Sequence, residues 1–192
     1  MLDFHDYVCL GASGGKECMV IMAKLIVEDK AYTNEDCIHN LINYITTDKE
    51  TSRVLMVESF GVNPLNKETM ISSMIRAKER VNRTNGKQAY HLIISIYRTK
   101  NSMSNEQKIT YGKNIIYDIG NYFLDHNIQS VLALQSEKEC NWDNVHIHCV
   151  INSIDMQTGL KITNTASLFN NLLFMLKNEY PFLRMEPYVT YD

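Results

Sequence analysis

A pair of histidines one residue apart is the feature of the sequence that most directly indicates chemistry. His146 and His148 lie in the apolar run VHIHCVIN, which has the composition of a strand. Because side chains alternate between the two faces of a strand, both imidazoles project to the same side, one strand repeat apart. Neutral imidazole nitrogens suit borderline divalent ions such as Mn²⁺, and phosphate oxygens in the same site would also admit Mg²⁺. Two strand histidines without a ligand are the alternative.

Further ligands for such an ion are expected from neighbouring strands. The segment LQSEKE ends the preceding apolar run, and consecutive strands are usually adjacent in a sheet. Gln135 is therefore the leading candidate for a third ligand, with Glu137 second. His91, in the run YHLIISIY, is a candidate for the same ligand set or for a position behind it. A half-buried histidine with no ligand is the simpler interpretation of His91.

Tyr44 is the candidate nucleophile among the eleven tyrosines of the chain. It lies near the end of an expected helix and just before the polar stretch TTDKETS. A protonated phenol is a weak nucleophile, so attack would require a phosphate polarised by the metal and a nearby base. Tyr32 is the next candidate, and a helix-end tyrosine without a catalytic role is the alternative interpretation of Tyr44.

Basic residues are concentrated between positions 76 and 100, where Glu79 is the one acid. The seven candidates for contacts with DNA are Arg76, Lys78, Arg80, Arg83, Lys87, Arg98 and Lys100. Such a stretch could follow a phosphate backbone, with Tyr90 and Tyr97 as surfaces on which bases stack. A solvated surface without a partner is the alternative.

The elements that must position these residues alternate along the chain. Apolar periodicity predicts helices over 34–45, 66–81, 104–126 and 165–180, the first of them capped by Asn34. Strands are predicted over 54–60, 90–97, 128–134 and 145–154, with a further apolar run at 23–27 and an extended segment at 188–191. This order predicts an α/β (α+β) sandwich, in which helices cover a largely antiparallel central sheet.

The composition fits one globular domain and excludes several classes of protein. With 192 residues and 45% hydrophobic content, the chain can bury a core, which rules out disordered, collagen-like and coiled-coil proteins. The formal charge of -3 gives no overall basic field, so an anionic partner must be met locally. Residues 1–21, with their Gly-rich patch, are expected to be a flexible leader, and residues 22–192 a single domain.

The cysteines and the hydropathy indicate where the protein works. The five cysteines are odd in number and lack CxxC spacing, which favours a reducing cytoplasm over a disulfide framework. No apolar run approaches the roughly 20 residues that cross a bilayer, so no membrane insertion is expected.

Three segments, taken in order, resemble the relaxase or mobilization-nuclease family, the tyrosine members of the HUH endonucleases. NLINYITTDKET resembles the family's early helix and tyrosine segment, and KQAYHLIISIYR is similar to its strand of the form Q-x-x-H-x-x-x-S. VHIHCVINSIDMQTGLKI closely resembles the family's His-hydrophobic-His strand, the following Asn and the T-G-x-K turn. The resemblance extends over about 23–180 and implies the HUH, palm-like relaxase fold.

The resemblance implies metal-dependent, site-specific nicking and rejoining of single-stranded DNA at an origin of transfer, as in plasmid or conjugative-element mobilization. Tyr44 would attack a phosphodiester, leaving a 5′-phosphotyrosine link and a free 3′-OH. His146 and His148 would hold the Mg²⁺ or Mn²⁺ that polarises the phosphate. Accessory DNA-binding or coupling proteins are the implied partners, and the bacterial cytoplasm is the implied location.

Two departures from the family pattern keep other functions open. The family usually carries a His-x-Asp pattern where this chain has Gln135-Ser136-Glu137, and a Gly-Glu pair where it has RTKNSMS. One alternative is a HUH nuclease of the replication-initiator or transposase type. The other is a catalytically impaired, DNA-binding relic of the fold.

Overall fold

A computed structural model describes residues 21–28, 30–97, 104–137, 145–181 and 183–191. Nearly all of the predicted leader lies outside these ranges, as do two of the predicted DNA-binding residues, Arg98 and Lys100. The ranges include every predicted metal ligand and the predicted nucleophile.

A six-stranded sheet in the order β2-β4-β5-β3-β1-β6 forms the centre of the protein. Its strands are β1 (Ile21–Glu28), β2 (Ser52–Phe60), β3 (Ala89–Tyr97), β4 (Ser130–Glu137), β5 (Val145–Asn152) and β6 (Leu183–Tyr191). Five of them form an antiparallel array, and β6 pairs in parallel with β1 at one edge. The prediction of a largely antiparallel central sheet is confirmed.

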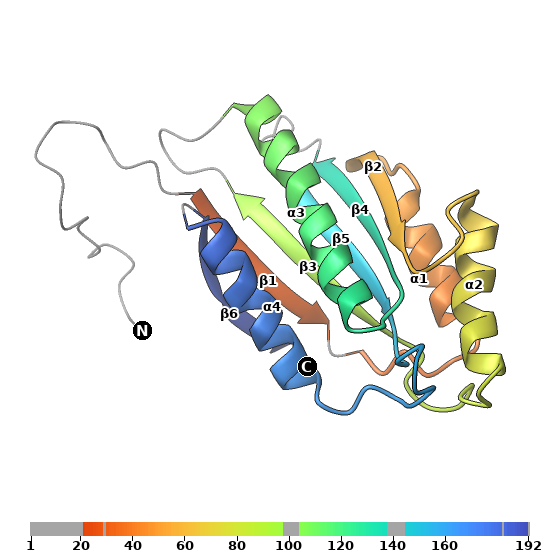
Figure 1. Ribbon diagram of the computed structural model, residues 1–192. Coiled ribbons are helices and arrows are strands. Elements are labelled where there is room, and N and C mark those ends of the chain that lie inside the picture. Colours follow the sequence, from red (N-terminus) through yellow and green to blue (C-terminus); the bar gives the residue numbers. More distant parts are fainter. Residues whose placement is uncertain (1–20, 29, 98–103, 138–144, 182, 192) are drawn as a thin grey trace, which may run out of the picture.

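Two helices cover each face of the sheet (Figure 1). On one face, α3 (Asn105–Asp125) and α4 (Thr165–Glu179) bury residues such as Ile119 and Leu172 against the apolar side of the strands. On the other, α1 (Cys37–Thr46) and α2 (Lys67–Glu79) pack around small side chains of β3 and β4. Within the described ranges, no helix combines the length and apolar character needed to span a membrane.

The first helix begins later than the sequence predicts. Asp36 occupies the N-cap position of α1 and makes no side-chain capping bond. The expected cap, Asn34, instead accepts a hydrogen bond through its carbonyl from the Cys37 N–H, at 3.3 Å. The prediction of Asn34 as the cap was wrong because residues 34–36 form a turn before the helix. By contrast, Ser104 caps α3 in a reciprocal capping box.

Strand alternation divides polar from apolar side chains between the two faces. Ile147 and Cys149 of β5 lie in the core beneath α3 and α4. His146 and His148, which alternate with them, project toward the α1 side of the sheet. The same parity places His91 and Ser95 of β3 on this side, since Leu92, Ile94 and Ile96 belong to the opposite core.

We predict that Asn152→Ala destabilises the fold. Asn152 is fully buried, and its Nδ2 donates to the Met74 carbonyl of α2 at 3.0 Å and to Gln129 Oε1 at 2.8 Å. Its removal leaves buried acceptors unpartnered, which should lower the free energy of unfolding by about 1–3 kcal/mol. Urea unfolding followed by circular dichroism measures this loss. The exposed Asn121 of α3 provides the control, because Asn121→Ala should change stability by no more than about 0.5 kcal/mol; equal effects of the two changes would contradict the prediction.

Candidate active site

The strand register sets two predicted site residues and one serine in a row across the sheet. His146 of β5 lies opposite Ser95 of β3 and opposite Gln135 of β4. Ser95 Oγ is 2.6 Å from His146 Nδ1, and Glu137 Oε1 is 2.7 Å from His146 Nε2. Both ring nitrogens of His146 therefore lie close to a hydroxyl or carboxylate oxygen.

Gln135 holds the end of the helix that carries Tyr44. Its side chain is 2% exposed, and Nε2 donates to the Ile45 carbonyl at 2.7 Å. Because the amide nitrogen is committed to this helix end, the side-chain oxygen is the one atom of Gln135 with the chemistry of a metal ligand.

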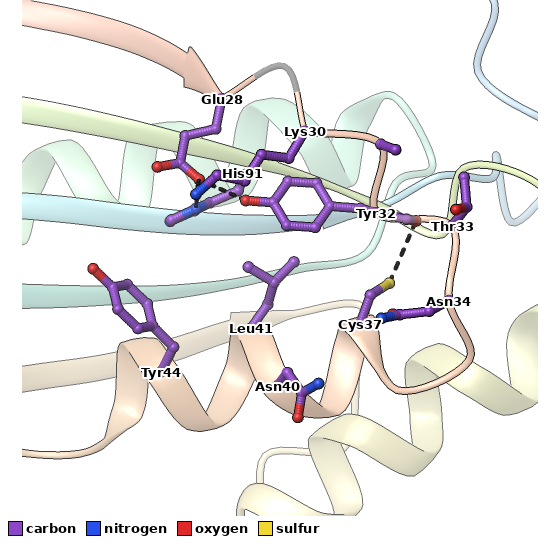
Figure 2. Close-up of a pocket in the computed structure, with 11 residues that line it drawn as sticks. Glu28, Lys30, Tyr32, Thr33, Asn34, Cys37, Asn40, Leu41, Tyr44 and His91 are labelled. Atoms are coloured by element: carbon purple, nitrogen blue, oxygen red, sulfur yellow. Dashed lines mark hydrogen bonds and ion pairs between the residues drawn. The ribbon is translucent and has the colours of Figure 1, made fainter. Parts of the chain in front are cut away.

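His91 lies beside His148 and connects it to a carboxylate. His91 Nε2 is 3.1 Å from His148 Nδ1, and the two rings stack with centroids 5.3 Å apart. On its other side, His91 Nδ1 is 3.0 Å from Glu28 Oε2, and the Tyr32 hydroxyl donates to the same oxygen at 2.5 Å (Figure 2). His91 is thus adjacent to the His pair, on the side away from Gln135.

Burial and neighbouring groups shift the pKa values of His148 and Glu28. Burial, reinforced by His91, His146 and Lys49, lowers the pKa of His148 to about 3. The hydrogen bond from His91 is the largest influence on Glu28 and, against the opposing effect of burial, lowers its pKa to about 2. At neutral pH, His148 is therefore a neutral imidazole with a nitrogen lone pair, and Glu28 is a carboxylate.

The side chain of Tyr44 rises from α1 toward the sheet, on the side where His91 lies (Figure 2). Its ring meets His148 edge-on with centroids 5.7 Å apart, and it meets His91 in the same way at 6.1 Å. The side chain is nevertheless 47% exposed, so a substrate can reach it. Lys49 Nζ lies 3.1 Å from the centroid of the Tyr44 ring, which brings a positive charge to the phenol.

Two cavities meet at Tyr44. One, of about 570 Å³, is lined by Lys49, Ser52, Ser95, Gln135, Glu137, His146 and His148, among others. The other, of about 470 Å³, lies between α1 and the end of β1 and is lined by Glu28, Tyr32, Asn40 and His91, among others (Figure 2). Tyr44 lines both cavities, so an extended substrate bound over its ring would have space on either side.

The donors around the larger cavity have the chemistry of a divalent-ion site. In the part of the chain that the structure describes, no three His, Cys, Asp or Glu side chains are already arranged as a metal centre. The cavity nevertheless brings together two imidazoles, a carboxylate and an amide oxygen, which are ligand types that Mn²⁺ accepts. The residues therefore fit an ion whose remaining ligands are phosphate oxygens.

The predicted DNA-binding residues separate into exposed and buried groups. Arg76, Arg80 and Arg83 are exposed on α2 and just after it. Lys78 is only 2% exposed, and its Nζ donates to the Gln88 carbonyl and to Gln88 Oε1. Lys78 follows Met74 by four residues, so helical spacing turns it into the core instead of toward a DNA backbone.

The remaining basic residue of this group lies beside the smaller cavity. Lys87 Nζ donates to the Lys30 carbonyl and lies 5.4 Å from the centroid of the Tyr32 ring.

Lys78 also differs from the exposed arginines in its pKa. Burial, and next the charge of Lys161, lower the pKa of Lys78 to about 7.

Sequence reasoning did not select three residues that complete the cluster. Lys49 stands within NLINYITTDKET, and Ser95 is the serine of the H-x-x-x-S strand, so both had a signal in the segments already singled out. Glu28 ends an apolar strand outside every such segment. Only the pairing of β1 with β3, which sets Glu28 opposite His91, brings it to the site.

A comparison with protein families identifies the chain. The sequence model of the relaxase family, described as MobA/VirD2-like, nuclease domain, matches residues 44–175. The matched range is more than half of the chain and extends from Tyr44 across both histidines of β5. The protein belongs to the relaxase family, and membership indicates a nuclease or transesterase that nicks DNA in mobilization. No curated protein and no solved structure gives a significant match.

The lowered pKa of His148 predicts a pH-dependent stability. Between about pH 3 and 6.5 the unfolded chain binds a proton at His148 that the folded protein does not, so the free energy of unfolding should rise with pH. The contribution approaches about 1.4 kcal/mol per pH unit. Urea unfolding across this range should give a smaller slope for His148→Gln than for the wild type. Equal slopes would show that His148 is protonated equally in both states.

Proposed function

We propose that the protein nicks and rejoins single-stranded DNA at an origin of transfer through a covalent link to Tyr44. The Tyr44 oxygen forms a bond to the scissile phosphorus, and the bond from phosphorus to the 3′ oxygen breaks. The phenolic proton is lost and the departing 3′ oxygen gains one, leaving a 5′-phosphotyrosine and a 3′-OH. The observation that carries the proposal is the edge-on position of the exposed Tyr44 ring against His148, 5.7 Å between centroids.

The side chains around the larger cavity suit the handling of a phosphate. We propose that His146 and His148 hold Mg²⁺ or Mn²⁺, with Glu137 and the Gln135 oxygen as further ligands. When bound, such an ion polarises the phosphate and offsets charge that develops on its oxygens. Lys49, beside the Tyr44 ring, stabilises negative charge on the phenol oxygen as its proton leaves.

The proposal also includes a surface that binds the DNA backbone and partner proteins that present the DNA. The exposed residues Arg76, Arg80 and Arg83 provide positive charge for the backbone of the bound strand, on the same side of the sheet as α1. Accessory DNA-binding or coupling proteins would present the single strand, and the reaction would take place in the bacterial cytoplasm.

A second candidate is a DNA-binding relic that has lost its nuclease activity. It is favoured by Gln135, which occupies the place of a family histidine and donates to the Ile45 carbonyl. The two candidates differ in whether a covalent adduct forms, because a relic would bind a single strand without forming one.

We predict that Tyr44→Phe abolishes covalent capture of a single-stranded oligonucleotide, because the phenol oxygen is the attacking atom. Wild-type protein incubated with labelled DNA from its genetic neighbourhood and Mn²⁺ should give an adduct on a denaturing gel. Mass spectrometry should place a nucleotide on the Tyr44 peptide. Tyr117→Phe is the control, since Tyr117 is exposed on α3, on the opposite side of the sheet, and should leave capture intact. An adduct formed by Tyr44→Phe would assign the nucleophile to another residue.

We predict that His146→Ala removes both Mn²⁺ binding and cleavage while DNA binding persists, because the loss is confined to an ion ligand. Isothermal titration calorimetry measures the ion, and fluorescence anisotropy measures the binding of a labelled strand. His126→Ala provides the control, since His126 is exposed at the end of α3, on the opposite side of the sheet. Undiminished nicking by His146→Ala would end the assignment of a two-histidine ion site.

A further inference from the structure

We propose that Glu28 and His91 act as a hydrogen-bonded relay that fixes the tautomer of His148, leaving Nε2 of His148 unprotonated at the Tyr44 cavity. Glu28 and His91 are thus positioning residues, which act through His148. The use that we assign to that nitrogen, binding a divalent ion, rests on the proposed function. The tautomers themselves do not depend on it.

The relay begins at a carboxylate oxygen that can only accept hydrogen bonds. Glu28 Oε2 receives the Tyr32 hydroxyl at 2.5 Å and lies 3.4 Å from Lys30 Nζ. These contacts hold the carboxylate on the α1 side of β1, where His91 Nδ1 is 3.0 Å away (Figure 2). The depressed pKa of Glu28 keeps it ionised. A neutral His91 therefore carries its proton on Nδ1, from which it can donate to this oxygen.

In the second step, the tautomer of His91 determines the tautomer of His148. With its proton on Nδ1, a neutral His91 has a lone pair on Nε2, and this atom lies 3.1 Å from His148 Nδ1. A hydrogen bond at this distance requires His148 to donate from Nδ1. His148 is buried, and a neutral ring that donates from Nδ1 has its lone pair on Nε2.

The residues that line the two cavities agree with the assignment of His148 Nδ1 as the donor to His91 Nε2. His91 lines the cavity beneath Glu28, whereas His148 lines the one that contains Gln135, Glu137 and His146. Nδ1 of His148 faces His91, so the rest of its ring is presented to the larger cavity. Histidine ligands of metals commonly donate their other ring N–H to an orienting acceptor, and here a second imidazole takes that place. Glu28 of β1 precedes residues 44–175, the range that the family model matches, whereas His91 and His148 lie within it.

Nitrogen NMR of the histidine side chains tests the relay directly. At about pH 8, where an ordinary imidazole is neutral, long-range ¹H–¹⁵N spectra of the metal-free protein should show both His91 and His148 protonated on Nδ1. His148 protonated on Nε2 would overturn the proposal, because its Nδ1 could then not donate across the 3.1 Å distance to His91 Nε2. His91 protonated on both nitrogens would also overturn it, because His91 would then be the donor.

Variants test whether Glu28 is the source of the constraint. Glu28→Ala should give His148 a mixture of tautomers and weaken Mn²⁺ binding, measured by calorimetry, by about 10- to 100-fold. Glu28→Gln keeps an oxygen acceptor and should restore the single tautomer. His126→Ala, at the exposed end of α3 on the opposite side of the sheet, is the control and should change neither measurement. If Glu28→Ala does not fold, His91→Phe releases His148 in the same way.

The outcomes separate this proposal from the function on which it rests. Wild-type tautomers in Glu28→Ala, together with unchanged Mn²⁺ affinity, would overturn the relay while leaving the nuclease proposal intact. The expected tautomers in a wild-type protein that binds no Mn²⁺ would support the relay and overturn the ion site.

Discussion

The structure of the site depends on the burial of imidazoles between a sheet and a helix. Polar rings removed from water must find partners inside the protein, because an unpartnered buried donor or acceptor costs about 1–3 kcal/mol. His148 finds one in His91, and His91 finds a second in Glu28. Each partner stands on a different strand. The sheet order β5-β3-β1 is therefore also the order in which the polar contacts run.

Helix α1 is held on the sheet by a buried polar contact as well as by apolar packing. Gln135 ties the end of α1 to β4 through the Ile45 carbonyl, and Ile38, Ile42 and Ile45 bury the apolar side of the helix. Tyr44 precedes Ile45 in this helix, so its backbone is held against the sheet while nearly half of its surface is exposed. The phenol therefore lies beside the buried imidazole of His148, as the proposed function requires.

Much of the architecture was predictable from periodicity, and the failures have physical causes. The four helices and the antiparallel sheet follow from apolar spacing and turn residues. The start of α1 does not, because Asn34 and Asp36 are both good caps and local geometry chose between them. Lys78 lies in the core, which its helical spacing from Met74 indicates and its charge alone does not. The predicted roles of Tyr44, Gln135 and the histidines remain predictions.

The sequence by itself determined that the side chains of His146 and His148 lie on the same face of their strand, since alternation along a strand is a local property. It also determined the family, because the segments around Tyr44, His91 and β5 carry the family's spacing in linear order. Only the tertiary structure decided which residues stand behind the pair. Glu28 and His91 are 63 positions apart and meet because β1 and β3 pair in one particular register. Strand pairing is set by the packing of the whole sheet, and no local pattern in the chain encodes it.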